Sequence, residues 1–232
     1  MRERPSHPVK PVVRKTTLAV DVVVLSPQAE SLAALLVRTP AGGRERWSLP
    51  WDAPLPGEGL EDAAARIAEG ALGASPALLE QVGAFADARR HPGDADVSVG
   101  VVALTPHGDA ALVAGAEWFS LAALPPLSPR HRAIVDRATT VVRQRVDQSP
   151  LAFRLLPPTF TLSDLQGIYE LLLGRRLHKA SFRRALQASY LVEPTDEWRS
   201  EGRGRPAQLF RYAPRKRRGA RRGVRFDLFT EN

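Results

Sequence analysis

The sequence contains no cysteine, which excludes a disulfide framework, a thiolate metal site and a cysteine nucleophile. It also has no stretch approaching the roughly 20 apolar residues that a membrane-spanning helix needs. Residues 1–15 combine prolines with charges and lack the apolar segment of a signal peptide. We therefore expect a loose N-terminal tail on a cytoplasmic protein.

Excess positive charge is missing from the first part of the chain and concentrated in the second. Residues 1–149 carry 16 basic and 17 acidic side chains, whereas residues 150–232 carry 17 basic and 8 acidic ones. The net charge is therefore −1 in the first part and +9 in the second. Two modest domains fit within 232 residues. Because a phosphate-binding surface concentrates charge in this way, the second part is expected to bind nucleic acid.

A helix-turn-helix pattern begins at Thr161. Apolar residues recur every three or four positions up to Leu172, between a capping-box-like start at Thr161 and a left-handed stop expected at Gly174. A second helix is expected over 179–189, with one apolar face and one cationic or amide-bearing face. Arginine and glutamine can make paired hydrogen bonds to guanine and adenine edges in the major groove. The predicted base-reading or phosphate-binding residues are Lys179, Arg183, Arg184 and Gln187.

A basic hairpin is expected directly after this second helix. Residues 190–192 and 208–212 are predicted strands, joined by the polar loop 193–207. In the Gly-Arg-Gly-Arg-Pro run at 202–206, the glycines allow close backbone approach and the proline favours an extended arginine. An arginine-bearing ribbon suits the narrow minor groove of A·T-rich DNA, so it is predicted to be the wing of a winged helix. Its predicted DNA contacts are Arg199, Arg203 and Arg205; the alternative is an ordinary solvated hairpin.

The first part of the chain predicts an α+β domain. Strands are expected over 18–25, 33–37, 81–86, 97–104 and 117–119, with a turn-rich loop at 40–46 and a charged loop at 87–96. An amphipathic helix is expected from Leu60 to a stop at Gly73, and a longer one over 129–146. Strands with one helix between them and another at the end favour a layered sandwich.

Several motifs carry a family resemblance. Trp-Ser-Leu-Pro at 47–50, Glu-Gly-Leu-Glu-Asp-Ala-Ala-Ala-Arg at 58–66 and Leu-Gly at 72–73 are similar to parts of a Nudix box. Together with Leu-Leu-Pro-Pro-Thr-Phe-Thr-Leu at 155–162 and the 202–207 run, the chain resembles the Nudix-related transcriptional regulators (NrtR family) over about residues 16–212.

The resemblance implies a Nudix-like α/β/α sandwich with a mixed sheet, followed by a C-terminal winged helix-turn-helix domain. The expected division is a tail at 1–15, an effector and dimerisation domain at 16–148, a DNA-binding domain at 149–213 and a basic tail at 214–232. It also implies a homodimer on a palindromic operator, with ADP-ribose or a related nucleotide as effector. The basic run 215–225 is expected to add salt-sensitive affinity for DNA, the alternative being a solubilising tail.

The Nudix pattern predicts a catalytically inactive domain. Active boxes use several glutamates on one helix face to hold divalent cations, which neutralise a diphosphate and activate water. Aligning the box on Arg66 and Gly73 places Glu58 at the first glutamate and Asp52 where glycine belongs. The three helix glutamates are replaced by Ile67, Gly70 and Ala71. We therefore predict no catalytic residue, no metal ion and no cofactor, although Glu69 remains as an alternative base.

The resemblance implies that this domain keeps an effector site without hydrolysis. Indole faces stack on adenine and arginines match phosphates, which guides the choice of contact residues. The predicted contacts are Arg46, Trp47, Trp51, Phe85, Asp87, Arg89 and Arg90. The alternative is that the two tryptophans are core residues and the arginines solvated.

The sequence thus predicts a dimeric transcriptional regulator, most simply a repressor, that binds double-stranded DNA and a nucleotide-type effector. Two alternatives remain open. The chain could be a metal-dependent Nudix hydrolase of nucleotide diphosphates, or a protein that binds nucleic acid without sequence preference.

Overall fold

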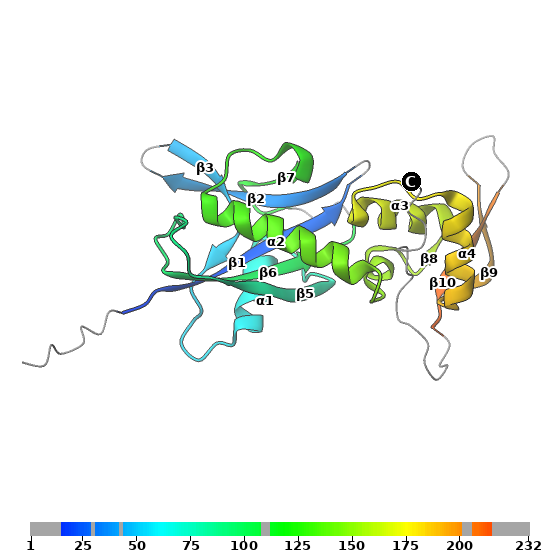
Figure 1. The fold of residues 1–232 in the computed structure, drawn as a ribbon, viewed down its shortest axis with the longest axis horizontal. Helices are drawn as coiled ribbons and strands as arrows, with labels where there is room; N and C mark the ends of the chain where they lie inside the picture. The colour runs from blue at the N-terminus through cyan, green and yellow to red at the C-terminus, as the bar shows by residue number, and fades with distance from the viewer. Residues whose placement is uncertain (1–14, 29–30, 42–43, 108–111, 201–205, 215–232) are drawn as a thin grey trace, which may run out of the picture.

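The N-terminal part of the protein is built around a mixed β-sheet (Figure 1). The structure is a computed structural model that describes residues 15–28, 31–41, 44–107, 112–200 and 206–214. Within these residues the sheet has seven strands, and five of them follow the order β3-β2-β1-β6-β5. β4 and β7 pair with β1 and β2 respectively. The strands are β1 (Leu18–Pro27), β2 (Leu32–Ala41), β3 (Arg44–Ser48), β4 (Trp51–Asp52), β5 (Leu78–Phe85), β6 (Val97–Leu104) and β7 (Ala116–Ser120).

β1 is the central strand of this sheet and is buried on both faces after Leu18. It pairs antiparallel with β2, from Leu25 opposite Ala34, and parallel with β6, from Leu18 opposite Val97. A run of β-branched residues is the pattern of a strand covered on both sides. The expected mixed sheet is confirmed.

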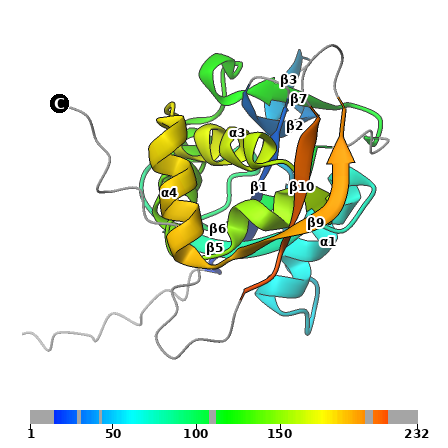
Figure 2. The same cartoon turned by 90° about the vertical axis from the view of Figure 1, so that its right-hand side faces the viewer.

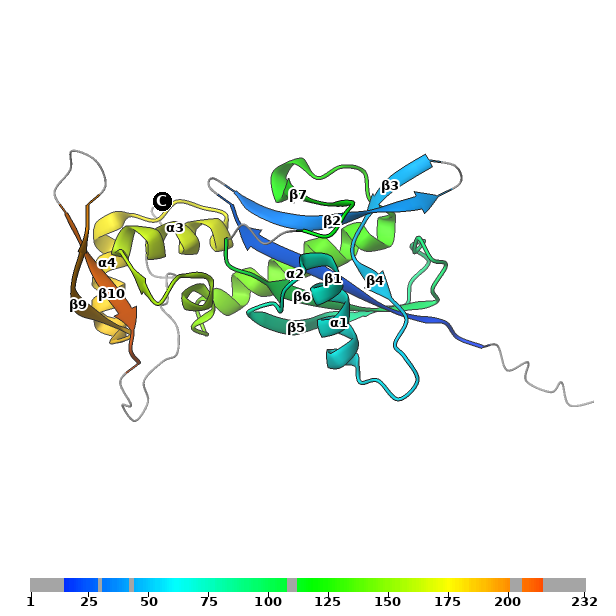
Figure 3. The same cartoon turned by 180° about the vertical axis from the view of Figure 1, so that it is seen from behind.

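Two helices cover opposite faces of the sheet, α2 (Pro129–Val146) in the view of Figure 1 and α1 (Leu60–Leu72) in that of Figure 3. α1 ends at Gly73, which adopts the left-handed conformation (φ 71°) that glycine tolerates best. α1 and the strand residues Val20, Val22 and Val24 share one hydrophobic cluster. α2 shares a second cluster with Val23, Leu25 and Leu36. The predicted α/β/α layering is confirmed.

The C-terminal part is a winged helix domain. α3 (Leu162–Leu173) begins at a capping box in which Thr161 and Asp164 satisfy each other's backbone N–H groups, and it ends at Gly174 with φ 69°. α4 (Lys179–Ser189) follows, and Phe182 on it packs against Tyr169 of α3 with ring centroids 5.7 Å apart. A small sheet of β8 (Thr159–Phe160), β9 (Val192–Arg199) and β10 (Ala207–Tyr212) completes the domain.

The structure corrects several predicted boundaries. The loop expected at 40–46 is largely the hairpin of β2 and β3, which pair from Val37 opposite Ser48 to Ala41 opposite Arg44. Tyr190 is not part of a strand: its φ of 54° closes α4, and the strand begins at Val192. The polar segment after it is strand as far as Arg199, because β10 satisfies its backbone while its side chains stay largely solvated.

Two short 3-10 helices and β8 were not predicted. η1 (Leu121–Ala123) follows β7, and η2 (Leu151–Leu155) joins α2 to the winged helix. Segments this short leave little periodic pattern in the sequence.

The two parts share a hydrophobic core. The cluster on the α2 face continues from Val142 and Val146 to Leu151 in η2 and to Leu165 and Tyr169 in α3. Across the described residues, no helix is both long and apolar enough to cross a membrane.

Candidate functional site

α4 presents the residues predicted to read DNA. Phe182 and Leu186 are 1 % exposed and fix the helix on α3. Four polar side chains on the remaining surface are exposed, and none has a hydrogen bond or ion pair within the described ranges. They are Lys179, Arg183, Arg184 and Gln187. The helix is therefore held by its apolar face while its cationic face stays available to a ligand.

The β9–β10 ribbon lies at the same end of the molecule as α4, as Figure 2 shows with both elements facing the viewer. Arg199 on β9 donates from Nη2 to both carboxylate oxygens of Asp164, at 2.8 Å each. Because Asp164 is in the first turn of α3, this pair ties the ribbon to the helix-turn-helix. Arg203 and Arg205 lie outside the described residues.

Arg66 on α1 occupies the carboxylates left in the Nudix-like motif. Its Nε lies 2.8 Å from Glu58 Oε1, its Nη2 2.9 Å from Glu58 Oε2, and its Nη1 2.8 Å from Asp52 Oδ2. The hydrogen bond from Arg66 lowers the pKa of Glu58 to about 2, helped by the backbone N–H of Leu55. The negative charge of Asp52, which stands where the pattern has glycine, is thus paired inside the motif.

None of the three helix positions that carry glutamates in active boxes has a metal-binding side chain here. Ile67 and Ala71 are 7 % and 4 % exposed and belong to the cluster between α1 and the sheet. Gly70 has no side chain, and a Cβ at this position would have no atom within 4 Å. Glu69 accepts a 2.5 Å hydrogen bond from Ser75 Oγ. These residues do not fit the oxygen-rich coordination of a divalent cation.

Four predicted effector residues lie on or against the loop between β5 and β6. Trp51 packs on this loop, and a Cβ on Gly93 would lie only 2.1 Å from the Trp51 ring, so the contact requires glycine there. Asp87, Arg89 and Arg90 are exposed on the loop. Arg89 pairs with Asp87 and Arg90 with Asp94. The pKa of Asp87 is lowered mainly by the hydrogen bond that the backbone N–H of Arg89 donates to its carboxylate, and further by the Arg89 side chain.

The other predicted effector residues lie on neighbouring strands. Arg46 is exposed on β3. The half-buried Trp47 ring carries the Arg38 guanidinium 4.9 Å from its centroid and contacts Phe119 edge-on at 4.7 Å. Phe85 packs beside Gly100, where a Cβ would be 3.0 Å from its ring. Trp47 and Phe85 are therefore engaged in packing on the α2 side of the sheet.

A buried polar cluster beneath this loop was not predicted. Asp21 of β1, His91 of the loop and His131 of α2 are at most 1 % exposed. Asp21 Oδ1 lies 3.0 Å from His91 Nε2 and 2.8 Å from His131 Nε2, the second contact being poorly aligned for a hydrogen bond. A lone aspartate inside a run of valines was the signal for this cluster, because a buried charge needs partners.

The cluster has the residue types of a metal site, but its hydrogen bonds do not fit one. His91 Nδ1 accepts from the Gly93 N–H at 3.0 Å, and His131 Nδ1 accepts from the Leu49 N–H at 3.1 Å. Each neutral ring therefore carries its proton on Nε2, which faces Asp21. A metal-bound histidine has the reverse arrangement, with the other nitrogen donating.

Burial lowers the pKa of His131, which outweighs the opposing effect of Asp21. Burial would raise the pKa of Asp21, yet the contacts with His131 and His91 lower it to about 2. At neutral pH the cluster therefore holds the Asp21 carboxylate beside an uncharged His131.

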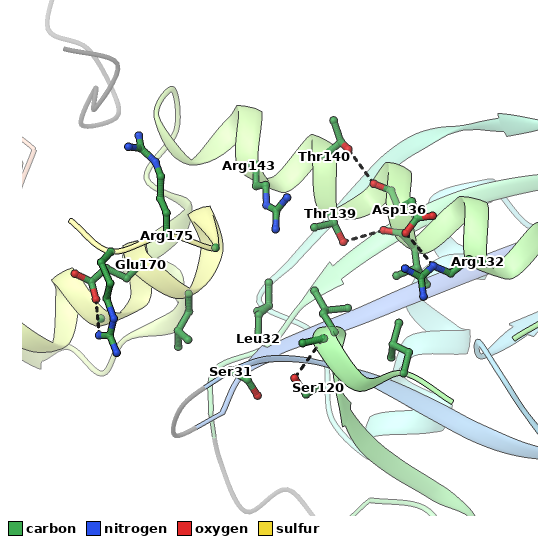
Figure 4. A pocket seen from close by; sticks show the side chains of 18 residues that line it. Ser31, Leu32, Ser120, Arg132, Asp136, Thr139, Thr140, Arg143, Glu170 and Arg175 are labelled. Carbon is green, nitrogen blue, oxygen red and sulfur yellow. Dashed lines mark hydrogen bonds and ion pairs between the residues drawn. The ribbon is translucent and has the colours of Figure 1, made fainter. Parts of the chain in front are cut away.

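A cavity of about 970 Å³ lies between the two domains (Figure 4). Its walls come from α2, η1, the start of β2 and the C-terminal end of α3, and include Arg143, Glu170 and Arg175. None of the predicted effector residues lines it.

Comparison with known proteins supports both domains. Residues 15–138 match the NUDIX domain model, and residues 152–212 match the model for the NrtR DNA-binding winged helix domain. The chain is 31% identical over 211 residues to the "ADPR responsive transcriptional repressor NtrR" of Acinetobacter baylyi, covering 84% of this chain and 82% of that protein.

Solved structures show the same arrangement. Shewanella oneidensis NrtR in complex with a 27mer DNA has a TM-score of 0.73 and 29% identity, covering 85% of this chain and 94% of that one. A MutT/nudix family protein from Enterococcus faecalis, at 20% identity and a TM-score of 0.66, covers 91% of this chain and 90% of its own and shares the fold. This chain therefore belongs to the NrtR family, in which a NUDIX domain precedes a DNA-binding winged helix domain.

Proposed function

We propose that this protein is a transcriptional repressor that binds an operator through α4 and responds to ADP-ribose through its Nudix-like domain. The observation that carries the proposal is the exposed, unpaired cationic face of α4 in a chain related to an ADPR-responsive repressor. The related Shewanella protein was solved with DNA, which supports DNA as the ligand of the winged helix. A regulator of this kind acts where the chromosome lies, so we place it in the cytoplasm.

Lys179, Arg183, Arg184 and Gln187 are proposed to contact the major groove. The ribbon carrying Arg203 and Arg205 is proposed to reach the minor groove. Arg199 takes a different part, because its guanidinium is bound to Asp164 and sets the angle of the ribbon.

We propose a homodimer on a palindromic operator. One winged helix buries a small interface, and two copies on half-sites supply the affinity that a single copy lacks. The proposed division is an effector and dimerisation domain at 16–148 and a DNA-binding domain at 149–213, and the element order, with the Nudix-like sheet before the winged helix, supports it. The proposed basic tail, 214–232, adds affinity that does not depend on sequence.

The proposed effector contacts are the residues around the β5–β6 loop, with Arg89 and Arg90 binding phosphates. Their side chains are 55% and 81% exposed, and their present carboxylate partners are surface pairs. Surface pairs of this kind contribute about 0–1 kcal/mol each, so a diphosphate can replace them. Trp51 would then offer its ring beside the loop, while Arg46, Trp47 and Phe85 contribute from the adjoining strands.

We propose that the Nudix-like domain does not hydrolyse its ligand. Glu58 is bound by Arg66, and Ile67 and Ala71 fill the core. Too few carboxylates remain to hold a catalytic cation, which argues against the hydrolase alternative.

The experiment that tests the function is a binding titration with the DNA beside this protein's own coding region. A duplex carrying a palindrome from that region should bind more tightly than a scrambled duplex of equal length, and ADP-ribose should shift the affinity. Equal affinity for both duplexes would favour the alternative of a protein that coats nucleic acid by charge alone.

A further inference from the structure

The first turn of α2 holds both ends of the loop between β5 and β6. Arg130 is 3 % exposed, and its Nη1 donates to the carbonyl oxygens of Ala95 at 2.7 Å and Asp96 at 3.1 Å. Its Nη2 donates to the carbonyl oxygen of Asp87 at 2.6 Å. Asp87 stands at the beginning of the loop and Ala95 and Asp96 at its end. One buried guanidinium therefore sets the span of the loop, with charge-assisted hydrogen bonds.

The next residue of α2 fixes the middle of the same loop. His131 contacts Asp21, and Asp21 accepts a hydrogen bond from His91, which belongs to the loop. His131 Nδ1 also accepts from the backbone N–H of Leu49, just before β4. The His91 ring in turn packs edge-on against Trp51 at 4.6 Å. Four of the proposed effector residues, Trp51, Asp87, Arg89 and Arg90, thus lie on or against a segment that α2 holds in place.

The opposite end of α2 is part of the DNA-binding domain. Val142 and Val146 share a core with Leu165 and Tyr169 of α3. Arg143 lies against Gly174, where a Cβ would be 2.7 Å from its Nη2. An uninterrupted helix of 18 residues spans roughly 27 Å, and close packing at both of its ends lets it transmit a displacement. Figure 1 shows α2 crossing the sheet from the side of this loop to the winged helix.

We propose that Arg130 and His131 are positioning residues that pass occupancy of the β5–β6 loop to the winged helix through α2. This inference rests on the proposed function, because it requires ADP-ribose at the loop and DNA at α4. Ligand binding that widens or narrows the loop changes the carbonyl positions that hold Arg130. The helix then shifts along its axis and moves α3, which supports α4. Coupling between two sites requires such an element with different contacts in the two states.

The test compares the affinity of the full-length protein for its operator duplex without and with saturating ADP-ribose. In the wild type the two dissociation constants should differ by about 5- to 150-fold, the usual range of coupling between sites. Arg130→Gln should bind DNA alone as the wild type does and bind ADP-ribose measurably, but its two constants should agree within about twofold. Arg130→Lys keeps the positive charge but has fewer hydrogen-bond donors. Its two dissociation constants should differ by less than those of the wild type but by more than those of Arg130→Gln.

Arg137→Gln is the matched control, because Arg137 lies on the same helix and donates to the carbonyl oxygen of Val82 in β5, outside the loop. In this variant the ratio of the operator dissociation constants with and without ADP-ribose should equal that of the wild type. If the two operator dissociation constants of Arg130→Gln differ as much as those of the wild type, the inference is overturned. A complete loss of ADP-ribose binding would also overturn it, since Arg130 would then belong to the ligand site. If the wild-type protein has the same operator dissociation constant with and without ADP-ribose, the proposed function is refuted instead.

Hydrogen exchange of the wild type gives a readout that needs no variant. Adding ADP-ribose should change amide protection in residues 87–96, in the first and last turns of α2 and in α3. Protection that changes in the loop alone would contradict transmission through α2. This measurement therefore tests the inference even if the Arg130 variants do not fold.

Discussion

Arg66 Nε lies 2.8 Å from Glu58 Oε1, so the one glutamate that matches the Nudix pattern is bound by the arginine of the same motif. Of the three helix positions that should supply further carboxylates, Ile67 and Ala71 are buried in the core and Gly70 has no side chain. The motif therefore retains its structural ion pair while its metal-binding face has become hydrophobic. Arg66 connects the loop before α1 to the helix through Glu58 and Asp52.

This arrangement predicts that the protein does not hydrolyse ADP-ribose. We expect no release of AMP above background with magnesium or manganese, from the wild type or from Arg66→Ala, in which Glu58 is freed. One or two solvated carboxylates bind a hard cation too weakly to activate water. The measurement is product release by chromatography beside an active MutT-type enzyme. Release that depends on the metal and is lost in Glu58→Gln or Glu69→Gln would show that the domain is an enzyme.

Arg183 and Arg184 on α4 are predicted to provide sequence preference. Each is exposed, and an arginine bidentate to guanine contributes about 1–3 kcal/mol of discrimination. By that estimate, Arg183→Ala and Arg184→Ala should each weaken operator binding by roughly 5- to 150-fold. Binding to scrambled DNA should persist and remain salt-sensitive. Anisotropy titrations at two salt concentrations measure both, with Arg132→Ala on α2 as the control; an unchanged preference in both variants would refute the assignment of α4.

Arg199 is predicted to act on DNA binding by holding the ribbon. Burial would raise the pKa of Asp164, but hydrogen bonds from Arg199 and from Thr161 lower it, so the pair is charged at neutral pH. Arg199→Ala should cost about 0.5–1.5 kcal/mol of stability and also reduce operator affinity. Asp164→Asn should reduce operator affinity too, although it removes no positive charge. If Asp164→Asn binds as the wild type does while Arg199→Ala does not, Arg199 contacts DNA directly.

Arg211→Ala is the control for this comparison. Arg211 also sits on the ribbon and pairs with Glu193 at 3.4 Å, but both residues belong to the ribbon itself. Arg211→Ala removes one positive charge, as Arg199→Ala does, but leaves the contact between the ribbon and α3 intact. Its effect on the operator should therefore be smaller than that of Arg199→Ala.

The buried cluster predicts a falling stability in acid. The pKa of His131 is lowered below its ordinary 6.5, so the unfolded chain takes up a proton first and the free energy of unfolding falls as pH drops below about 6.5. The pKa of Asp21 is lowered from 3.8 to about 2, so its contribution is complete above 3.8 and is lost towards 2. Denaturant titrations from pH 7.5 downward measure both windows.

Asp21→Asn separates the two contributions. The amide keeps the shape of the carboxylate but not its charge, and should cost about 1–3 kcal/mol at neutral pH. Between pH 3.8 and 2 its stability should fall less steeply than that of the wild type, because the contribution of Asp21 is gone while other carboxylates still titrate. A variant as stable as the wild type would show that the carboxylate contributes nothing to the fold.

Sequence periodicity predicted α2 and α4 with their observed bounds, because both helices bury a regular apolar stripe. The wing was predicted too short, since the segment 193–199 lacks a regular apolar alternation and its order comes from pairing with β10. The role of Arg199 was equally out of reach, because Asp164 is 35 residues away in the chain. Asp21 gave a usable signal, but its partners His91 and His131 come from distant segments that only the fold brings together.

The most direct test of the account is a titration of the operator-bound protein with ADP-ribose, followed by fluorescence anisotropy of the labelled duplex. The account predicts that ADP-ribose changes the operator dissociation constant by about 5- to 150-fold. Binding to a scrambled duplex should stay weak throughout. An operator affinity that is the same at every ADP-ribose concentration, with the ligand shown to bind, would contradict it.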